Sequence, residues 1–202
     1  MEMRLFSPDF AWQYFKEKAD LYRKYGYDIL EERRRFLSWL ERLPEPVLEI
    51  GTGRGYFTLV LGMQGYNVIS IDPDFEAVEF AKSLLSSQGE FVNVDLLIGS
   101  GDSIPLPNRS VGSVVMFNLW HHLEDVDELI SEIRRVIRPG GMLAVVDFSQ
   151  TGFDLVDKIH QEVYGEGHLV VRQGFDDLIS SFPEARIYRY KTDFEEGVCL
   201  IL

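Results

Sequence analysis

Apolar side chains follow a helical spacing over residues 10–43 and then gather into short continuous runs. The helical spacing is interrupted near Gly26, so this stretch predicts two helices. Pro44 and Pro46 end the helical pattern and release the chain into an apolar run at 47–50. The chain is therefore expected to begin with two helices and to continue with a first strand.

From residue 47 onward, apolar runs alternate with stretches of helical spacing. The expected strands are 47–50, 66–72 and 142–148, with one more in each of the segments 96–107 and 111–125. The expected helices are 56–64, 75–88 and one that begins near Asp125 with Asp125 and Glu128 as a capping box. Such an alternation implies parallel βαβ units. The run at 142–148 is almost wholly apolar, as a central strand covered on both faces should be.

The pattern is weaker beyond residue 150. It predicts helices near 154–163 and 175–182, a loop through Gly165 and Gly167, and two final strands at 186–192 and 198–202 joined by a short hairpin connection. We expect an N-terminal helical cap over 1–43 and one further domain over 44–202.

The composition is that of one α/β domain with a core of its own. A single cysteine, Cys199, excludes an intramolecular disulfide and a cysteine-based metal cluster, and we expect it to pack in the core. The sequence has no apolar run near 20 residues and no secretory leader pattern, so a cytoplasmic protein without a membrane span is expected.

The charge balance is strongly acidic. With 33 acidic against 20 basic residues, the formal net charge is −13, which argues against broad contact with nucleic acid. The basic run 33–35 lies between Glu31-Glu32 and Phe36-Leu37, a pattern typical of a solvated helix face.

The first strand runs into a glycine-rich loop. Glu49 is followed by Gly51, Gly53 and Gly55, which would bring bare backbone amides close to a ligand. In the dinucleotide fingerprint the third glycine stands three residues after the second, a position that Tyr56 occupies here. The carboxylate of Glu49 also disfavours a pyrophosphate, so a cationic or zwitterionic ligand fits better and an NAD(P)-dependent oxidoreductase is a distant alternative.

This E-x-G-x-G-x-G loop resembles motif I of the class I S-adenosylmethionine (SAM) dependent methyltransferases. Four further segments resemble that family in the family's order: a strand that ends in Asp72-Pro73, the run 99–107, the strand and loop 111–125, and the turn 135–141. The likeness is greatest to the small-molecule methyltransferases of ubiquinone and menaquinone biosynthesis. It implies an α/β fold with a doubly wound, mostly parallel seven-stranded sheet, an antiparallel last strand and helices on both faces.

The resemblance also implies the cofactor and its contacts. SAM is the expected cofactor and S-adenosyl-L-homocysteine the expected product, with no metal. In the family, the acid after the second strand binds the ribose and the acid of the G-D-S segment reaches the adenine. The expected cofactor-binding residues are Glu49, Gly51, Thr52, Gly53, Gly55, Asp72, Pro73, Asp102, Ser103, Asn118 and Leu119.

Methyl transfer needs a positioned nucleophile and, for some acceptors, a general base. His121 and His122 follow the fourth strand beside the expected cleft and are the first candidates, although both could serve only to shape the loop. His160, His168 and Asp147 are weaker candidates at the same end of the sheet.

The first forty residues are rich in aromatic side chains. Tyr14, Tyr22 and Tyr25 are candidates for a lid over the acceptor, where ring faces would attract a sulfonium, while the alternative is that these rings only cover the sheet. We expect a small-molecule acceptor and a monomer or homodimer. The acceptor, its reacting atom and whether the protein turns over or only binds SAM remain open from sequence.

Overall fold

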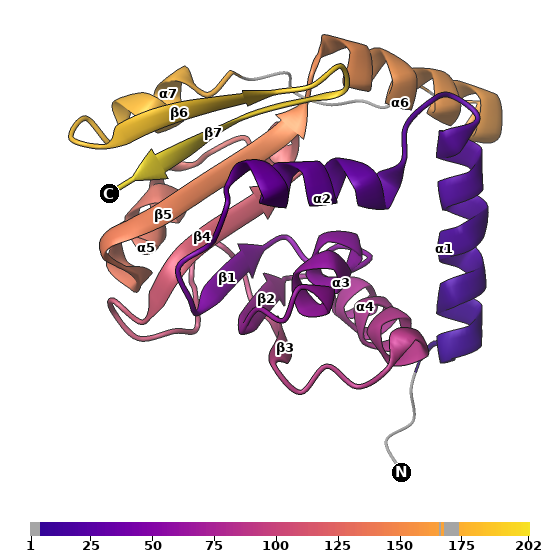
Figure 1. The fold of residues 1–202 in the computed structure, drawn as a ribbon, viewed down its shortest axis with the longest axis horizontal. Helices are drawn as coiled ribbons and strands as arrows, with labels where there is room; N and C mark the ends of the chain where they lie inside the picture. Colours follow the sequence, from indigo (N-terminus) through magenta and orange to yellow (C-terminus); the bar gives the residue numbers. More distant parts are fainter. Residues whose placement is uncertain (1–4, 166, 168–173) are drawn as a thin grey trace.

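The structure, a computed structural model, describes residues 5–165, 167 and 174–202 and contains one seven-stranded sheet in the order β3-β2-β1-β4-β5-β7-β6 (Figure 1). The strands are β1 (Val47–Ile50), β2 (Val68–Asp72), β3 (Val94–Ile98), β4 (Val111–Phe117), β5 (Ile137–Phe148), β6 (Arg186–Lys191) and β7 (Glu195–Ile201). The helices are α1 (Pro8–Arg23), α2 (Ile29–Trp39), α3 (Tyr56–Met63), α4 (Phe75–Gln88), the 3₁₀ helix η1 (Trp120–His122), α5 (Asp127–Val136), α6 (Gln150–Tyr164) and α7 (Asp176–Ser180).

The first five strands are parallel, and β7 is antiparallel to both β5 and β6. The predicted fold class is thereby confirmed. The reversal has a consequence for the site, because it brings the start of β7 to the edge where the parallel strands end. Glu195, the first residue of β7, is paired with Phe148, the last residue of β5.

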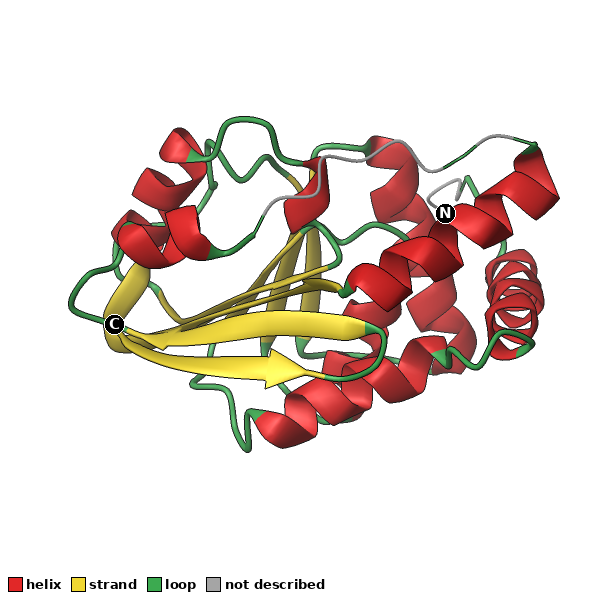
Figure 2. Cartoon of the chain, turned by 90° about the horizontal axis from the view of Figure 1, so that it is seen from above, coloured by secondary structure: helices red, strands yellow, loops and turns green. Residues whose placement is uncertain are grey.

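Helices cover both faces of the sheet (Figure 2). Successive residues of a strand point to opposite faces. Val115 of β4 accordingly packs in the cluster with α2 and α3, while Val114 packs with α5 and α7. Both faces of β4 are buried, which explains why its sequence is apolar without alternation.

Helix α1 stands across the end of the sheet toward which β4 and β5 point (Figure 1). Its N-cap Ser7 accepts a hydrogen bond from the Phe10 amide at 3.2 Å. The chain turns at Gly26, whose φ of 87° suits glycine, and α2 begins after the N-cap Asp28. The predicted break between two N-terminal helices is confirmed.

Several boundary predictions were wrong. Helix α5 begins at Asp127 after an uncapped Val126, and Asp125 bonds to the Asp127 amide at 3.2 Å in place of a capping box with Glu128. Strand β5 begins at Ile137 because that residue already pairs with Val111. Strand β7 begins three residues earlier than expected, which makes the hairpin connection shorter.

The expectation that Cys199 packs in the core is confirmed. At the end of α5, the guanidinium of Arg135 donates to the carbonyl oxygens of Ile104 and Leu106 at 2.8 and 2.6 Å, which is a structural role. Within the described ranges, no helix has the length and apolar character that crossing a membrane requires.

Candidate active site

The glycine loop is tied to the next strand by one carboxylate. Asp72, at the end of β2, accepts a hydrogen bond from the Gly53 amide at its Oδ2 (2.8 Å) and one from the Asp74 amide at its Oδ1 (2.9 Å). Both oxygens are therefore engaged by backbone donors while the residue stays partly exposed. This contact fixes the loop at the carboxyl edge of the sheet, where open α/β sheets bind ligands.

Two glycines of the loop serve different purposes. Gly55 has φ of 76°, and a Cβ there would lie 2.7 Å from the Cβ of Ala81, so glycine lets the loop pack on α4. Gly53 has φ of 49°, and a Cβ there would meet nothing within 4 Å. The backbone at Gly53 is thus open on the side away from the protein, as the approach of a ligand to bare amides requires.

Gly53→Ala and Gly55→Ala are expected to separate ligand binding from packing. Gly53→Ala should weaken binding of S-adenosylhomocysteine at least ~10-fold, because its methyl group fills the open space, and should cost only about 1 kcal/mol in folding. Gly55→Ala should lower the free energy of unfolding by about 1–3 kcal/mol through overpacking. Calorimetric titration measures the affinity for S-adenosylhomocysteine, and urea unfolding measures the stability. Unchanged affinity in Gly53→Ala would contradict the assignment of Gly53 to the cofactor site.

Glu49 lies beneath the loop rather than on its open side. Its side chain is only 1% exposed, and its Oε2 accepts from the hydroxyls of Thr58 (2.5 Å) and Ser70 (2.7 Å). Burial raises the pKa of Glu49 to about 7, although these two hydrogen bonds and the charge of Arg33 oppose the shift. The hydroxyl of Thr52 is also below the loop, 2.6 Å from that of Ser70.

The remaining predicted cofactor residues follow neighbouring strands along the same edge. Pro73 follows β2, and the exposed pair Asp102 and Ser103 follows β3. Leu119 follows β4 and reaches over the loop, with its Cδ2 at 2.9 Å from where a Cβ of Gly51 would be. The order of the strands therefore brings these residues together, as the parallel sheet predicts.

Asn118 has an unusual environment for a loop residue. Its φ of 54° is left-handed, its amide donates to the Val146 carbonyl at 2.8 Å, and its Nδ2 donates to Glu195 at 3.3 Å. Its Oδ1 is buried and has no hydrogen-bond partner among the described residues. A buried acceptor left open at this edge is a place for a donor group of a ligand.

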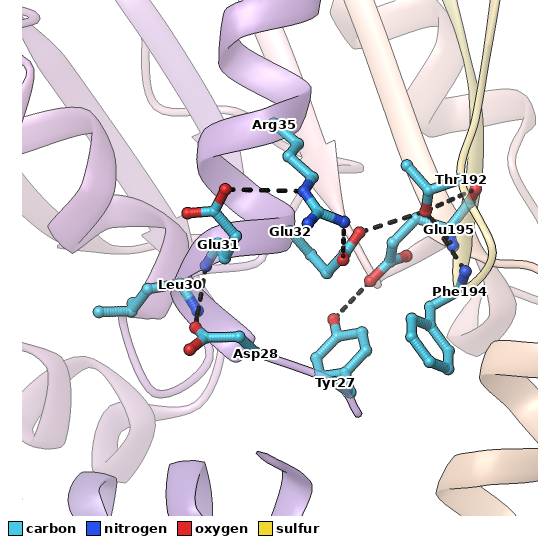
Figure 3. A network of polar contacts seen from close by, with 9 residues as sticks. All are labelled: Tyr27, Asp28, Leu30, Glu31, Glu32, Arg35, Thr192, Phe194 and Glu195. Carbon is cyan, nitrogen blue, oxygen red and sulfur yellow. Dashed lines mark hydrogen bonds and ion pairs between the residues drawn. The ribbon is translucent and has the colours of Figure 1, made fainter. Parts of the chain in front are cut away.

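A buried polar cluster joins the N-terminal helices to the β6–β7 turn (Figure 3). The Tyr27 hydroxyl donates to Oε1 of the fully buried Glu195, and Thr192 donates to Glu32 at 3.2 Å. Burial raises the pKa of Glu195 to about 8, against the lowering effect of Tyr27 and Arg33. The sequence did not identify Glu195 as a site residue, since it was assigned to the connection.

Arg33 is buried, so the interpretation of residues 33–35 as a solvated face was wrong for this residue. Its Nη1 donates to the Ile29 carbonyl at 2.7 Å, and its guanidinium lies 4.4 Å from the centre of the Phe117 ring. Arg33 stands four residues after Ile29 and three before Phe36, on the apolar face of α2. That helical spacing was the feature of the sequence that indicated a buried Arg33.

The two candidate catalytic histidines lie in η1. His121 is 3% exposed; its Nδ1 is 2.5 Å from Oδ1 of Asp147, and its amide donates to Oδ2 at 2.7 Å. His122 is exposed, and its ring centre lies 4.0 Å from that of His121. Burial and the neighbouring His121 lower the pKa of His122, which keeps it neutral at pH 7.

The three tyrosines that were candidates for a lid do not share one environment. Tyr14 packs edge-on against Phe80 at 5.3 Å, and the buried Tyr22 packs against Tyr27 at 5.7 Å. The Tyr25 hydroxyl instead donates a hydrogen bond to Glu162, which links the turn after α1 to α6.

Other predicted features lie elsewhere. His160 is on α6, and burial, together with the charge of Lys18, lowers its pKa. His168 lies outside the described residues.

A groove of about 990 Å³ runs between α4 and β3 and includes Leu85, Phe91 and Leu96 but no residue of the glycine loop.

The residues present at the edge fit a nucleoside cofactor with an amino-acid tail. Gly53 leaves its backbone open, Asp72 offers a partly exposed carboxylate, and Asn118 has an unpartnered acceptor. Residues 48–145 match the family model described as a methyltransferase domain. Over these residues the chain carries a methyltransferase domain. This match supports the family resemblance, whose expected cofactor is SAM.

The relatives of this methyltransferase domain match the chain over different lengths. An uncharacterised methyltransferase of Mycobacterium bovis is 34% identical over 100 residues, 50% of this chain and 38% of that protein. A demethylmenaquinone methyltransferase of Thermus thermophilus is 24% identical over 67% of this chain and 63% of its own length. The crystal structure of a SAM-dependent methyltransferase from Aquifex aeolicus has a TM-score of 0.67 at 22% identity, covers 97% of this chain and 98% of that one, and supports the fold.

Proposed function

We propose that this protein transfers a methyl group from SAM to a small-molecule acceptor, with residues 1–43 as a cap over the site. The observation that carries the proposal is the glycine loop held by Asp72 with its backbone open at Gly53. The demethylmenaquinone methyltransferase among the relatives supports a small acceptor.

The chain's own residues would bind and orient the reactants. When bound, SAM would supply a methyl group whose bond to the positively charged sulfur breaks as the acceptor's lone pair bonds to the methyl carbon, so that the sulfur leaves as a neutral thioether. Asp72 would accept hydrogen bonds from the ribose hydroxyls, Asp102 one from the adenine amino group, and Asn118 one from the cofactor's ammonium. The aromatic side chains of α1 would exclude water.

A general base would take the acceptor's proton where the acceptor has one to lose. Asp147 accepts a hydrogen bond from Nδ1 of His121, which leaves Nε2 of that ring as the basic nitrogen. His122 is exposed and neutral at pH 7, so it can accept a proton from outside the core. We assign His122 as the base and the His121–Asp147 pair as the support that positions it.

His122→Ala should lower kcat by ~10²-fold or more while binding of S-adenosylhomocysteine stays within about twofold. Asp147→Asn should act in the same direction, because its amide nitrogen can no longer accept from the His121 amide. Steady-state kinetics over pH 6–9 would measure both effects. Full turnover by His122→Ala would favour the alternative that the two histidines only shape the loop.

Ligand binding tests the proposal first. At ~100 times Kd, SAM or S-adenosylhomocysteine should stabilise the protein by about 2.7 kcal/mol, which raises Tm by roughly 5–10 °C for a chain of this size. NAD and NADP at matched concentrations should have no such effect. A shift only with the dinucleotides would contradict the proposal, and SAM binding without turnover across an acceptor screen would favour a non-catalytic binding protein.

A further inference from the structure

Three basic side chains from separate elements converge where the N-terminal cap meets the glycine loop. Lys18 comes from α1, Arg33 from α2 and Arg54 from the glycine loop. None of the three makes an ion pair with any residue in the described part of the chain, although the chain has 33 acidic residues. We refer to these three residues as the basic triplet.

The basic triplet lies on aromatic rings. The guanidinium carbons of Arg54 and Arg33 lie 5.3 Å from the centre of the Tyr14 ring and 5.9 Å from that of Tyr56, respectively. Lys18 Nζ lies 5.7 Å from the centre of the Tyr22 ring. Tyr14, Lys18 and Tyr22 follow each other at intervals of four along α1, so they share one face of that helix.

The positive charges of the triplet act on one another. Burial, and then repulsion from Arg54 and Arg33, lower the pKa of Lys18 to about 8. Glu49 and Glu195 do lie near Arg33, but burial raises the pKa values of these two acids to about 7 and about 8. At neutral pH they therefore compensate the triplet only in part.

Two buried polar atoms beside the triplet have no partner. Tyr56 and Arg33 are 8% and 9% exposed, and the Tyr56 hydroxyl and Arg33 Nε bond to no described residue. The two side chains are neighbours, since the guanidinium lies over the Tyr56 ring. Buried donors are normally satisfied, so these two indicate room for an acceptor atom of a ligand.

The cofactor of the proposed function cannot supply all of the missing negative charge. SAM carries one carboxylate, one ammonium and one sulfonium, so its binding adds a net positive charge beside the triplet. Arg33 is buried and Lys18 partly buried, while Arg54 is exposed, so a second ligand that brings an anion would be stabilised by all three charges.

We propose that the methyl acceptor is an aromatic carboxylate whose charged group is held by the basic triplet and whose ring packs on the tyrosines of α1. This inference rests on the proposed function and specifies its substrate class. Lys18 and Arg54 are the recognition residues, because Arg33 is in part occupied by the Ile29 carbonyl. The carboxylate of such an acceptor would offset the positive charge that SAM brings.

Benzoate and benzamide form a matched pair of probes, since they have the same shape and differ in charge. With the full chain saturated by S-adenosylhomocysteine, benzoate should bind at least ~10-fold more tightly than benzamide in calorimetric titrations. Lys18→Met and Arg54→Met should each remove most of that preference. Lys16→Met, on an exposed position of the same helix, should keep it.

The outcomes separate this inference from the proposed function. If S-adenosylhomocysteine binds but benzoate does not bind, or binds no better than benzamide, the substrate class is wrong and the methyltransferase proposal stands. A preference for benzoate that survives in both Lys18→Met and Arg54→Met would also overturn the assignment. If S-adenosylhomocysteine does not bind, the proposed function fails, and the same two probes titrated into the unliganded chain still test the triplet.

Discussion

Asp72→Asn is expected to weaken binding of S-adenosylhomocysteine by about 100-fold, or about 2.7 kcal/mol. Asp72 receives backbone N–H groups at both carboxylate oxygens, from Gly53 at 2.8 Å and Asp74 at 2.9 Å. Asparagine has one acceptor oxygen and one NH₂ group, so one of the two amides would face a donor. The variant therefore disturbs the loop as well as the proposed ribose contact.

Calorimetric titration with S-adenosylhomocysteine measures the loss. Asp95→Asn, an exposed position on the neighbouring β3, provides the control and should bind as the parent does. Urea unfolding should register a smaller cost of about 1–3 kcal/mol for Asp72→Asn. Parent-like affinity in Asp72→Asn would remove the carboxylate from the cofactor site.

Glu195→Gln is expected to stabilise the protein in alkaline solution. Burial raises the pKa of Glu195 from 4.5 to about 8, so the folded state keeps a proton that the unfolded chain releases near pH 4.5. The stability that this proton contributes is complete below pH 4.5 and is lost as the pH rises to about 8. Glutamine has no proton to lose, and it can still accept from Tyr27.

The difference in free energy of unfolding between Glu195→Gln and the parent should grow between pH 5 and pH 8 and reach the order of 3–5 kcal/mol. Urea unfolding at several pH values measures it. Glu184→Gln, at an exposed position before β6, should show the same pH dependence of the free energy of unfolding as the parent. A pH-independent difference would mean that Glu195 is ionised in the folded protein. Some slope should persist in Glu195→Gln, because the pKa of Glu49 is also raised, to about 7.

Local sequence was enough to predict the glycine loop and its acid. The spacing of Gly51, Gly53 and Gly55 after a short apolar run encodes a strand, a turn and a helix within a dozen residues, and Asp72 ends the next strand. The parallel sheet then brings both together, which follows from the alternation of strands and helices.

The buried charges could not be predicted in the same way. Tyr27 and Glu195 are 168 residues apart and meet only because β7 runs antiparallel to β5. The hairpin pattern predicted two final strands but placed Glu195 outside them, so its burial was missed. Arg33 was misjudged because its two basic neighbours suggested a solvated face, while its helical position relative to Ile29 and Phe36 indicated a buried one.

The contact between Tyr27 and Glu195 also sets the order in which the site can form during synthesis. A growing chain has the glycine loop and the first strands well before β7 leaves the ribosome, and domains begin to fold as they emerge. Until then the side chains of Tyr27 and Arg33 lack Glu195 as a neighbour, and the N-terminal helices have no β6–β7 hairpin to pack against. We therefore expect the nascent protein to pair its parallel strands first and to form its closed, ligand-ready site only once β7 has emerged.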